Sequence, residues 1–360
     1  MISRKFILAA ASLVAASAYA GSVSLDARAE YVGKSYDKVP APVTGNADGT
    51  AANSGAIQVT RAKIDGKGKV NDSVDFRARF NVAPNSETAG YADGVSNRAD
   101  FLYVSAKLHD MVSLSIGKMG SGMGGLEGQY NGGDIYQLTN AIAGGGGQVT
   151  VPLYLSGADV KVQLAEGQSI DVSAMNQSFS SASPESNQGV GAGVTSANST
   201  KQTTTLNGIV YNGKFLDNSL SAVVSYHMED KGNSVKANYI AGGLRYSAAS
   251  FEVEGDYLSN VKDNGTTKDS TQTNRIKAKY MVDQFNPFVQ YEMSTNKVAD
   301  NKTNDVNVIT AALEYKPVKD QGFRYHLAYV NSQLKPASGA DTQTTTSVIA
   351  GVRVLADFLK

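Results

Sequence analysis

The 360-residue sequence contains no cysteine and no tryptophan, and only three histidines and eight prolines. Without cysteine, disulfides cannot contribute to its stability. A charge excess of one sign is also missing, because Lys and Arg number 33 and so do Asp and Glu. An even balance of this kind gives no reason to expect a nucleic-acid partner or a polybasic membrane contact.

Long hydrophobic runs are missing as well. The apolar run from Phe6 to Ala16 follows Ser3-Arg4-Lys5 and precedes Ala18-Tyr19-Ala20, which is the pattern of a secretory signal peptide with its cleavage site. We therefore expect residues 1–20 to be removed and residues 21–360 to form one domain. No later segment offers eighteen consecutive apolar residues, so we expect no transmembrane helix. The exported chain is then either a soluble periplasmic all-β protein or an outer-membrane β-barrel.

Strict alternation of apolar and polar residues is what the sequence has in abundance. In Asp72–Ala83, one face carries Val74, Phe76, Ala78, Phe80 and Val82 and the other carries Asp75, Arg77, Arg79 and Asn81. Similar patterns occupy 22–33, 250–259 and 273–283. Period two over about ten residues, with charges on the polar face, is typical of a barrel strand whose apolar side faces lipid. A soluble sandwich also alternates, so the number of such strands matters more than any one of them.

The pattern predicts sixteen strands, an even number as expected of a single-chain bacterial barrel. They are placed at 22–33, 56–70, 72–83, 98–109, 111–118, 157–165, 169–178, 203–214, 219–229, 235–248, 250–259, 273–283, 286–296, 305–316, 322–332 and 344–358. Connections after odd-numbered strands are long, and those after even-numbered strands are tight turns. This asymmetry predicts an antiparallel up-and-down transmembrane barrel with both termini in the periplasm and surface loops at 34–55, 179–202 and 260–272.

The longest interruption of the strand pattern follows Val112–Lys118 and continues to Gln148. A long segment without strand periodicity in a compact chain usually carries function or is disordered. Its apolar residues give it surface to pack on: Met119, Met123, Leu126, Tyr130, Ile135, Tyr136, Leu138 and Ile142. We expect this third long extracellular loop to fold into the lumen and narrow the hole.

Aromatic residues are predicted at the periplasmic ends of the outward-facing columns, where they would form an interfacial girdle. They are Tyr246, Phe251, Tyr280, Tyr315, Phe323, Tyr325 and Phe358. The first two strands and most of the last face outward mainly with small residues, which suggests an oligomer interface near the closure of the barrel.

Three stretches of the chain resemble the general porins of Gram-negative bacteria. VSLSIGKM (112–119) is similar to the porin strand before the third loop, and NPFVQYEM (286–293) and ITAALEYKPVKDQGFRYHLAYVNS (309–332) are similar to late porin hairpins. The resemblance implies a sixteen-stranded, homotrimeric barrel in the outer membrane, in contact with lipid bilayer and lipopolysaccharide, whose third loop forms an eyelet. The chain departs from the family in its third loop, where Gly125-Leu126-Glu127-Gly128 corresponds only loosely to the usual acidic stretch.

A channel of sixteen strands encloses water, and its selectivity depends on width and on charge at the constriction. The strongest cluster of lumen-facing cations is Arg61, Lys63, Arg77 and Arg79 on two paired strands. The resemblance to porins implies that such a basic wall faces acids on the inserted loop, and the acids available there are Glu127 and Asp134, which completes the candidate constriction. The same basic cluster could equally be an ordinary hydrated lumen wall. A second set, Glu252, Glu254 and Asp256 against Arg275, Lys277 and Lys279, is explained by cross-strand charge pairing alone.

Catalytic sites are not indicated. His109, His227 and His326 lie on three different predicted strands, Gly120–Gly125 lacks the context of a nucleotide site, and Asp263-Asn264-Gly265 reads as turn chemistry rather than a calcium site. We therefore predict a porin, not an enzyme, that passes small hydrophilic solutes and ions passively, with weak charge selectivity and without cofactor or metal. The alternative is a structural or adhesive barrel whose loops bind a partner and whose lumen is occluded.

Overall fold

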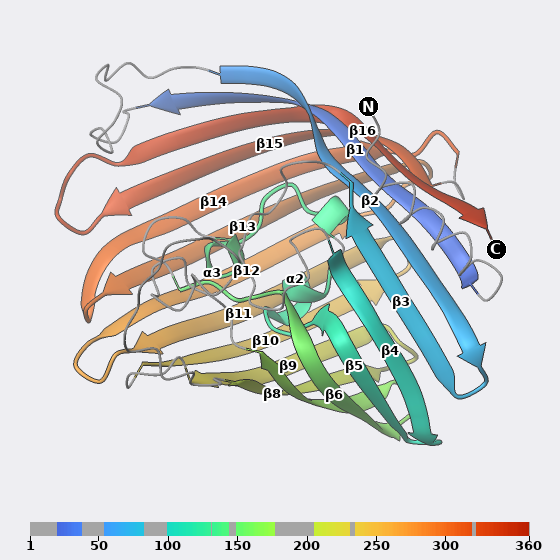
Figure 1. Cartoon of the computed structure of the whole chain (residues 1–360). Helices are drawn as coiled ribbons and strands as arrows, with labels where there is room; N and C mark the ends of the chain where they lie inside the picture. Colours follow the sequence, from blue (N-terminus) through green and yellow to red (C-terminus); the bar gives the residue numbers. More distant parts are fainter. Residues whose placement is uncertain are drawn as a thin grey trace, which may run out of the picture.

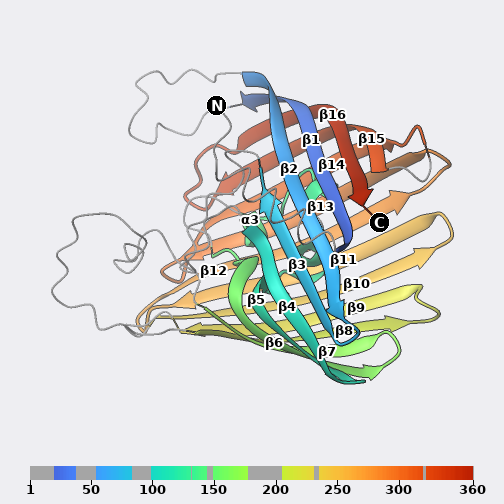
Figure 2. The same ribbon diagram turned by 45° about the vertical axis from the view of Figure 1, so that its right-hand side comes forward.

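Sixteen antiparallel strands form one closed barrel in the computed structural model, which describes residues 20–37, 54–82, 99–130, 132–143, 149–176, 205–230, 235–318 and 322–359. Each strand pairs with its neighbours along the chain, and the first pairs with the last (Figure 1). The strands are inclined to the barrel axis, as closure of a sheet requires (Figure 2). The sixteen-stranded barrel is confirmed, whereas residues 1–19 of the expected signal peptide lie outside the described residues.

The observed bounds agree with the predicted strands to within a few residues at most ends. The first half comprises β1 (Ala20–Asp37), β2 (Ser54–Asn71), β3 (Val74–Asn81), β4 (Ala99–His109), β5 (Val112–Gly120), β6 (Tyr154–Ala165), β7 (Gln168–Asn176) and β8 (Thr205–Phe215). The second half comprises β9 (Leu220–Asp230), β10 (Lys236–Ala248), β11 (Phe251–Asp263), β12 (Lys268–Tyr280), β13 (Phe285–Val298), β14 (Asn301–Tyr315), β15 (Gly322–Pro336) and β16 (Gln343–Leu359).

One of the expected surface loops, 260–272, is wrong. Pairing of β11 with β12 continues out to Asp263 and Lys268, so only a four-residue turn remains. In that turn the Asn264 side chain accepts hydrogen bonds from the backbone N–H groups of Thr266 at 3.0 Å and Thr267 at 2.8 Å. Residues 260–272 are almost all polar, so the apolar alternation ends before the two strands do. The other two expected loops, 34–55 and 179–202, lie largely outside the described residues.

Burial in this barrel is the reverse of that in a soluble protein. Large apolar side chains such as Ile276 (55 %) and Val289 (56 %) are exposed on the outside, whereas Glu254 (1 %) and Arg275 (4 %) are buried on the inside. An apolar exterior around a polar lumen is the arrangement of an outer-membrane barrel and not of a soluble sandwich. No helix among the described residues is long and apolar enough to cross a membrane.

The expected aromatic residues face outward near one rim of the barrel. Tyr246, Phe251, Tyr280, Tyr325 and Phe358 are all among the exposed large side chains. Beside them, the rings of Phe285 and Tyr315 stack at 4.9 Å across paired strands. This row is in the position of an interfacial girdle.

Ion pairs in the lumen reinforce the seam between β1 and β16. Arg353 of β16 binds Asp26 of β1 through its Nε at 2.7 Å and its Nη2 at 2.9 Å. Glu30 of β1 reaches across β16 to His326 of β15, with 2.7 Å between Oε1 and Nε2. Gly351 lies between these two residues in the register, so a side chain there would stand in the path of the Glu30–His326 contact.

Gly351→Ala should weaken this seam. A Cβ at position 351 would overlap the Ala29 carbonyl oxygen and lie 2.7 Å from Glu30 Cγ. Overpacking of this kind lowers the free energy of unfolding by about 1–3 kcal/mol. We therefore expect a lower midpoint of thermal unfolding, measured from the gel mobility of the folded barrel. Gly255→Ala is the matched control, because its Cβ would lie 3.6 Å from the nearest atom. Equal midpoints for the two variants would contradict the role of Gly351.

Candidate functional site

The segment between β5 and β6 folds into the barrel instead of extending from its rim. Its described residues include the short helices α2 (Gly125–Gln129), η1 (Gly132–Asp134) and α3 (Asn140–Ala143). In Figure 1 these elements lie inside the ring of strands. The chain can turn sharply into α2 because Gly124 and Gly125 adopt φ values of 91° and 63°, which residues with a Cβ disfavour.

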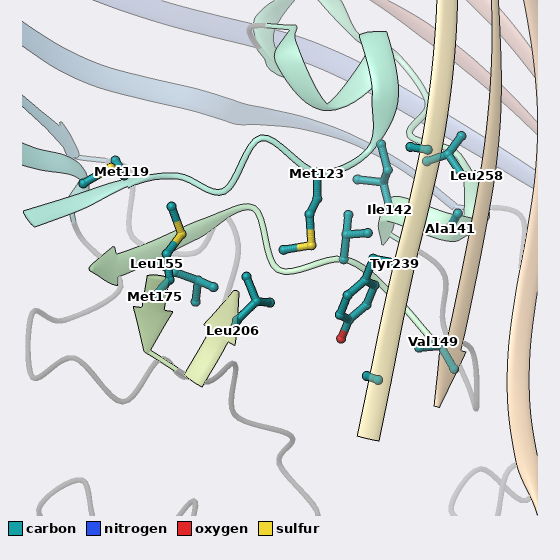
Figure 3. Packing of buried hydrophobic residues seen from close by; sticks show 13 residues of the cluster. Met119, Met123, Ala141, Ile142, Val149, Leu155, Met175, Leu206, Tyr239 and Leu258 are labelled. Atoms are coloured by element: carbon teal, nitrogen blue, oxygen red, sulfur yellow. The ribbon is translucent and has the colours of Figure 1, made fainter. Parts of the chain in front are cut away.

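Apolar packing fixes both ends of this inserted loop to the wall. Met123 and Ile142 of the loop pack with Tyr239 of β10 and Leu258 of β11 (Figure 3). Leu126 of α2 forms a second contact with Val210 and Val223. The wall residues point into the lumen, so the loop supplies the apolar surface that they would otherwise expose to water.

Carboxylates hold the backbone of the loop. The N–H of Leu126 donates to Asp256 Oδ1 at 2.7 Å, and the N–H of Asn140 donates to Glu292 Oε1 at 2.8 Å. Within the loop, the N–H of Thr139 donates to Glu127 Oε1 at 3.0 Å. A carboxyl oxygen accepts these backbone N–H groups in either protonation state, so the three contacts anchor a segment with little regular structure.

Arg275 of β12 is the centre of the anchoring cluster. Its Nη1 lies 2.8 Å from Glu254, its Nη2 contacts Asp256, and its Nε lies 3.9 Å from Glu127 of the loop. The predicted cross-strand pairs are present in the register, which matches Asp256 with Arg275 and Glu254 with Lys277. The structure adds to them a role in binding the loop, which the sequence analysis did not assign.

Glu127 is buried within this cluster, and burial raises its pKa to about 7 although Arg275 acts in the opposite direction. Tyr130 next to it donates its hydroxyl proton to Glu254, and burial together with that carboxylate raises the pKa of Tyr130. Burial thus shifts Glu127 toward its protonated form, and Tyr130 keeps its hydroxyl proton at neutral pH. The loop acid Glu127 thus faces an acidic and basic network on β11–β13 and not the predicted basic cluster.

Asp134 binds the opposite side of the barrel. Its Oδ1 lies 2.8 Å from Arg324 of β15 and 2.6 Å from Arg353 of β16. Burial alone would raise the pKa of Asp134, but these two guanidinium groups lower it, so it carries a negative charge. The loop therefore spans the lumen from the wall formed by β9–β12 to the wall formed by β15 and β16.

The predicted basic residues line β2 and β3, and each has a carboxylate partner on the wall. Arg61 binds Asp26 at 2.6 Å, and Arg77 binds Asp65 at 2.6 Å. Lys63 and Arg79 share Asp100, at 2.6 Å and 3.0 Å. We call Arg61, Lys63, Arg77 and Arg79 the basic wall.

The structure connects the basic wall with only one of the two predicted loop acids. Asp134, Arg353, Asp26 and Arg61 form a continuous chain of ion pairs, and a Cβ on Gly132 of the loop would lie 3.2 Å from Arg61 Nη1. The loop tip thus comes close to the basic wall at Arg61. Glu127 is held at the β11–β13 side by Arg275.

Several partners in this network were missed from the sequence. They are Asp26, Asp65, Asp100, Arg324 and Arg353. All of them fall in the polar phase of their strands, which was the available signal. Period two tells which face a residue occupies but not which residues of distant strands lie at the same depth.

A cavity of about 980 Å³ opens on the β1–β6 side, near the short turns. Four basic and two acidic side chains line it, together with hydroxyl groups; they are Lys67, Lys69, Arg77, Lys161, Asp75, Asp159, Tyr103, Ser105, Ser113 and Ser115. Arg77 belongs both to this cavity and to the basic wall. Basic side chains therefore outnumber acidic ones around this cavity.

The histidines have structural contacts. His227 Nε2 lies 2.9 Å from the Ser121 carbonyl at the start of the inserted loop, so its ring is directed at the loop backbone. His326 binds Glu30, and His109 Nδ1 accepts a hydrogen bond from the Met111 N–H at 3.3 Å. None of these contacts places an imidazole as the base of a serine nucleophile.

Comparisons with known proteins agree with this architecture. Residues 39–282, well over half of the chain, match the family model described as "Phosphate-selective porin O and P". Among curated proteins, none matches the chain closely enough to count as a relative.

Solved structures of three bacterial proteins share the fold. The trimer form of OmpT from Vibrio cholerae has a TM-score of 0.57 at 14 % identity, covering 94 % of this chain and 100 % of that chain. The anion-selective porin from Comamonas acidovorans gives 0.61 at 12 % identity, with 93 % and 99 % covered. OmpF from Salmonella typhi gives 0.54 at 16 % identity, with 92 % and 98 % covered. With the sixteen-stranded barrel and the family match together, the chain belongs to the phosphate-selective porin O and P family of Gram-negative outer-membrane channels.

Proposed function

We propose that this porin passes small hydrophilic anions by passive diffusion, phosphate-sized oxyanions among them. The observation that carries the proposal is the charge of the open part of the lumen, where basic side chains outnumber acidic ones around the 980 Å³ cavity. A low-dielectric wall focuses the field of such charges on the solute path and raises the local concentration of counter-ions. The name of the matching family supports the same sign of selectivity.

The constriction in this proposal lies between the tip of the inserted loop and the basic wall. Arg61, Lys63, Arg77 and Arg79 attract the anion, and Asp134 and Glu127 hold the loop that narrows the passage. The two loop acids are engaged with Arg324, Arg353 and Arg275, so they oppose the anion less than free carboxylates would. Selectivity then follows from the width of this gap and from the charges around it.

The surroundings of the channel follow from the same proposal. Residues 1–20 would be the cleaved export signal, and the apolar exterior would contact lipid and lipopolysaccharide. The small outward residues of β1, β2 and β16 would form the interface of a homotrimer. A trimer form is known for the structurally similar OmpT.

Planar-bilayer recording of the purified protein tests the proposal. We expect stepwise conductance and a reversal potential, under a salt gradient, that shows anions to be more permeant than cations. Replacing Arg61, Lys63, Arg77 and Arg79 by Ala should move the reversal potential toward cations and reverse its sign. The physical reason is that Asp26, Asp65 and Asp100 would then face the solute without their cations.

Lys107→Ala and Lys302→Ala are the controls, because both residues form exposed ion pairs at the ends of strands and contribute little to the field inside. A barrel that inserts without passing current would favour the structural or adhesive alternative. Unchanged reversal potential after substitution of the basic wall, with conductance intact, would show that these residues do not line the constriction.

A further inference from the structure

Phe101 of β4 lies between two members of the basic wall. The guanidinium carbon of Arg77 is 4.0 Å from the centre of the Phe101 ring, and that of Arg79 is 4.2 Å from it. In the register of β3 with β4, Arg79 lies directly opposite Phe101, and Arg77 lies opposite Tyr103, two residues further along β4. Both cations are therefore within the range of a cation–π interaction with one ring.

Neighbouring aromatic rings fix the orientation of Phe101. Tyr154 of β6 meets it edge to face, with ring centres 5.3 Å apart and planes at 88°, and Tyr103 lies at 6.1 Å and 80°. The Tyr154 hydroxyl accepts a hydrogen bond from Arg79 Nη2 at 2.9 Å. Edge-to-face pairs of this kind are favourable beyond their buried area, so the ring is a defined platform for the two guanidinium groups.

The ring and the carboxylates act on the arginines in different ways. Asp65 binds Arg77 and Asp100 binds Arg79, and each carboxylate cancels part of the positive charge that an anion would experience. An aromatic face attracts a cation through its quadrupole but carries no net charge. Phe101 therefore stabilises the two guanidinium groups while leaving their positive charge available to the lumen.

We propose that Phe101 is a positioning residue for anion selectivity, which fixes the orientation of the Arg77 and Arg79 guanidinium groups while they remain bound to Asp65 and Asp100. The inference rests on the anion-channel function proposed above. Arg77 lines the 980 Å³ cavity, whereas Arg79 is buried deeper beside Lys63 and Asp100. The ring thus holds the cation at the entrance and the cation at the constriction next to each other along the path of the anion.

Graded fluorination of Phe101 tests this role. Fluorine substituents weaken the negative face of the ring while keeping its shape almost unchanged, so they change the cation–π attraction and not the packing. We expect the anion-to-cation permeability ratio to fall stepwise with each fluorine, by about two- to fivefold for the fully fluorinated ring, with little change in single-channel conductance. Phe101→Leu should show the full loss, and Phe101→Tyr should keep the wild-type ratio.

The same fluorinated residue at Phe251, on the exterior, is the control for effects on the barrel as a whole. If leucine lowers the ratio but fluorination does not, the ring acts only by its shape and the inference is overturned. If Arg77→Gln and Arg79→Gln lower the ratio while every Phe101 variant retains it, the inference fails and the proposed anion channel stands. A wild-type protein without anion preference would overturn the proposed function itself, and the inference with it.

Discussion

Replacing Gly243 by valine should detach the inserted loop from the barrel wall. A Cβ at position 243 of β10 would overlap the Asp256 carboxylate and lie 2.8 Å from Leu126 Cγ. Asp256 would have to move, and the Leu126 N–H would lose its acceptor. Disturbing the buried pair of Asp256 with Arg275 in this way costs about 3–5 kcal/mol.

The expected result is an open barrel with a mobile loop. Single-channel recordings should show current noise several times that of the wild type. Chymotrypsin should also cleave the loop at Tyr130 and Tyr136, which are protected while the loop is docked. Gly242→Val is the matched control, because a Cβ at this adjacent position has no atom within 4 Å. Quiet currents and full protease resistance in Gly243→Val would show that α2 is not held by this part of the wall.

Raising the pH from 5 to 8 should loosen the same loop through Glu127. Burial raises the pKa of this carboxyl from 4.5 to about 7 in the folded protein. A raised pKa means that the docked loop binds the proton more tightly than the free loop. Protonation of Glu127 therefore stabilises docking fully below pH 4.5, and this stabilisation is lost as the pH rises through 7. A difference of this size corresponds to a free energy of the order of 3 kcal/mol for docking of the loop.

The groups that face Glu127 set the limits of this effect. Arg275 of β12 favours the ionised form, whereas Glu292 of β13 opposes it, and the Thr139 N–H binds Glu127 Oε1. We expect current noise to increase between pH 5 and pH 8 in the wild type and to stay at its low-pH level in Glu127→Gln. Noise that instead increases toward acidic pH, in both proteins, would mean that protonation of wall carboxylates governs docking.

The barrel could be predicted from the sequence because the pattern that specifies its strands depends on residues close together in the chain. Lipid on one side and water on the other impose period two on every strand, as in Val74–Val82, and tight turns impose their own residues. The ends of β11 and β12 resemble a loop in the sequence because their residues are almost all polar and give no apolar alternation. The six candidate constriction residues lie on β2, β3 and the inserted loop, and the sequence did not identify the carboxylate and guanidinium groups that bind them.

What the sequence determined by itself is therefore the number and order of the strands and the face of the sheet that each residue occupies, because each depends on neighbours a few positions away. Only the tertiary structure decided that Glu127 binds Arg275 and that Asp134 binds Arg324 and Arg353. The same holds for the contact of the Phe101 ring with the guanidinium groups of Arg77 and Arg79. These contacts join residues up to more than two hundred positions apart, and their distances depend on the closure and the register of the whole barrel. The alternation of apolar and polar residues determines neither the closure nor the register of the barrel.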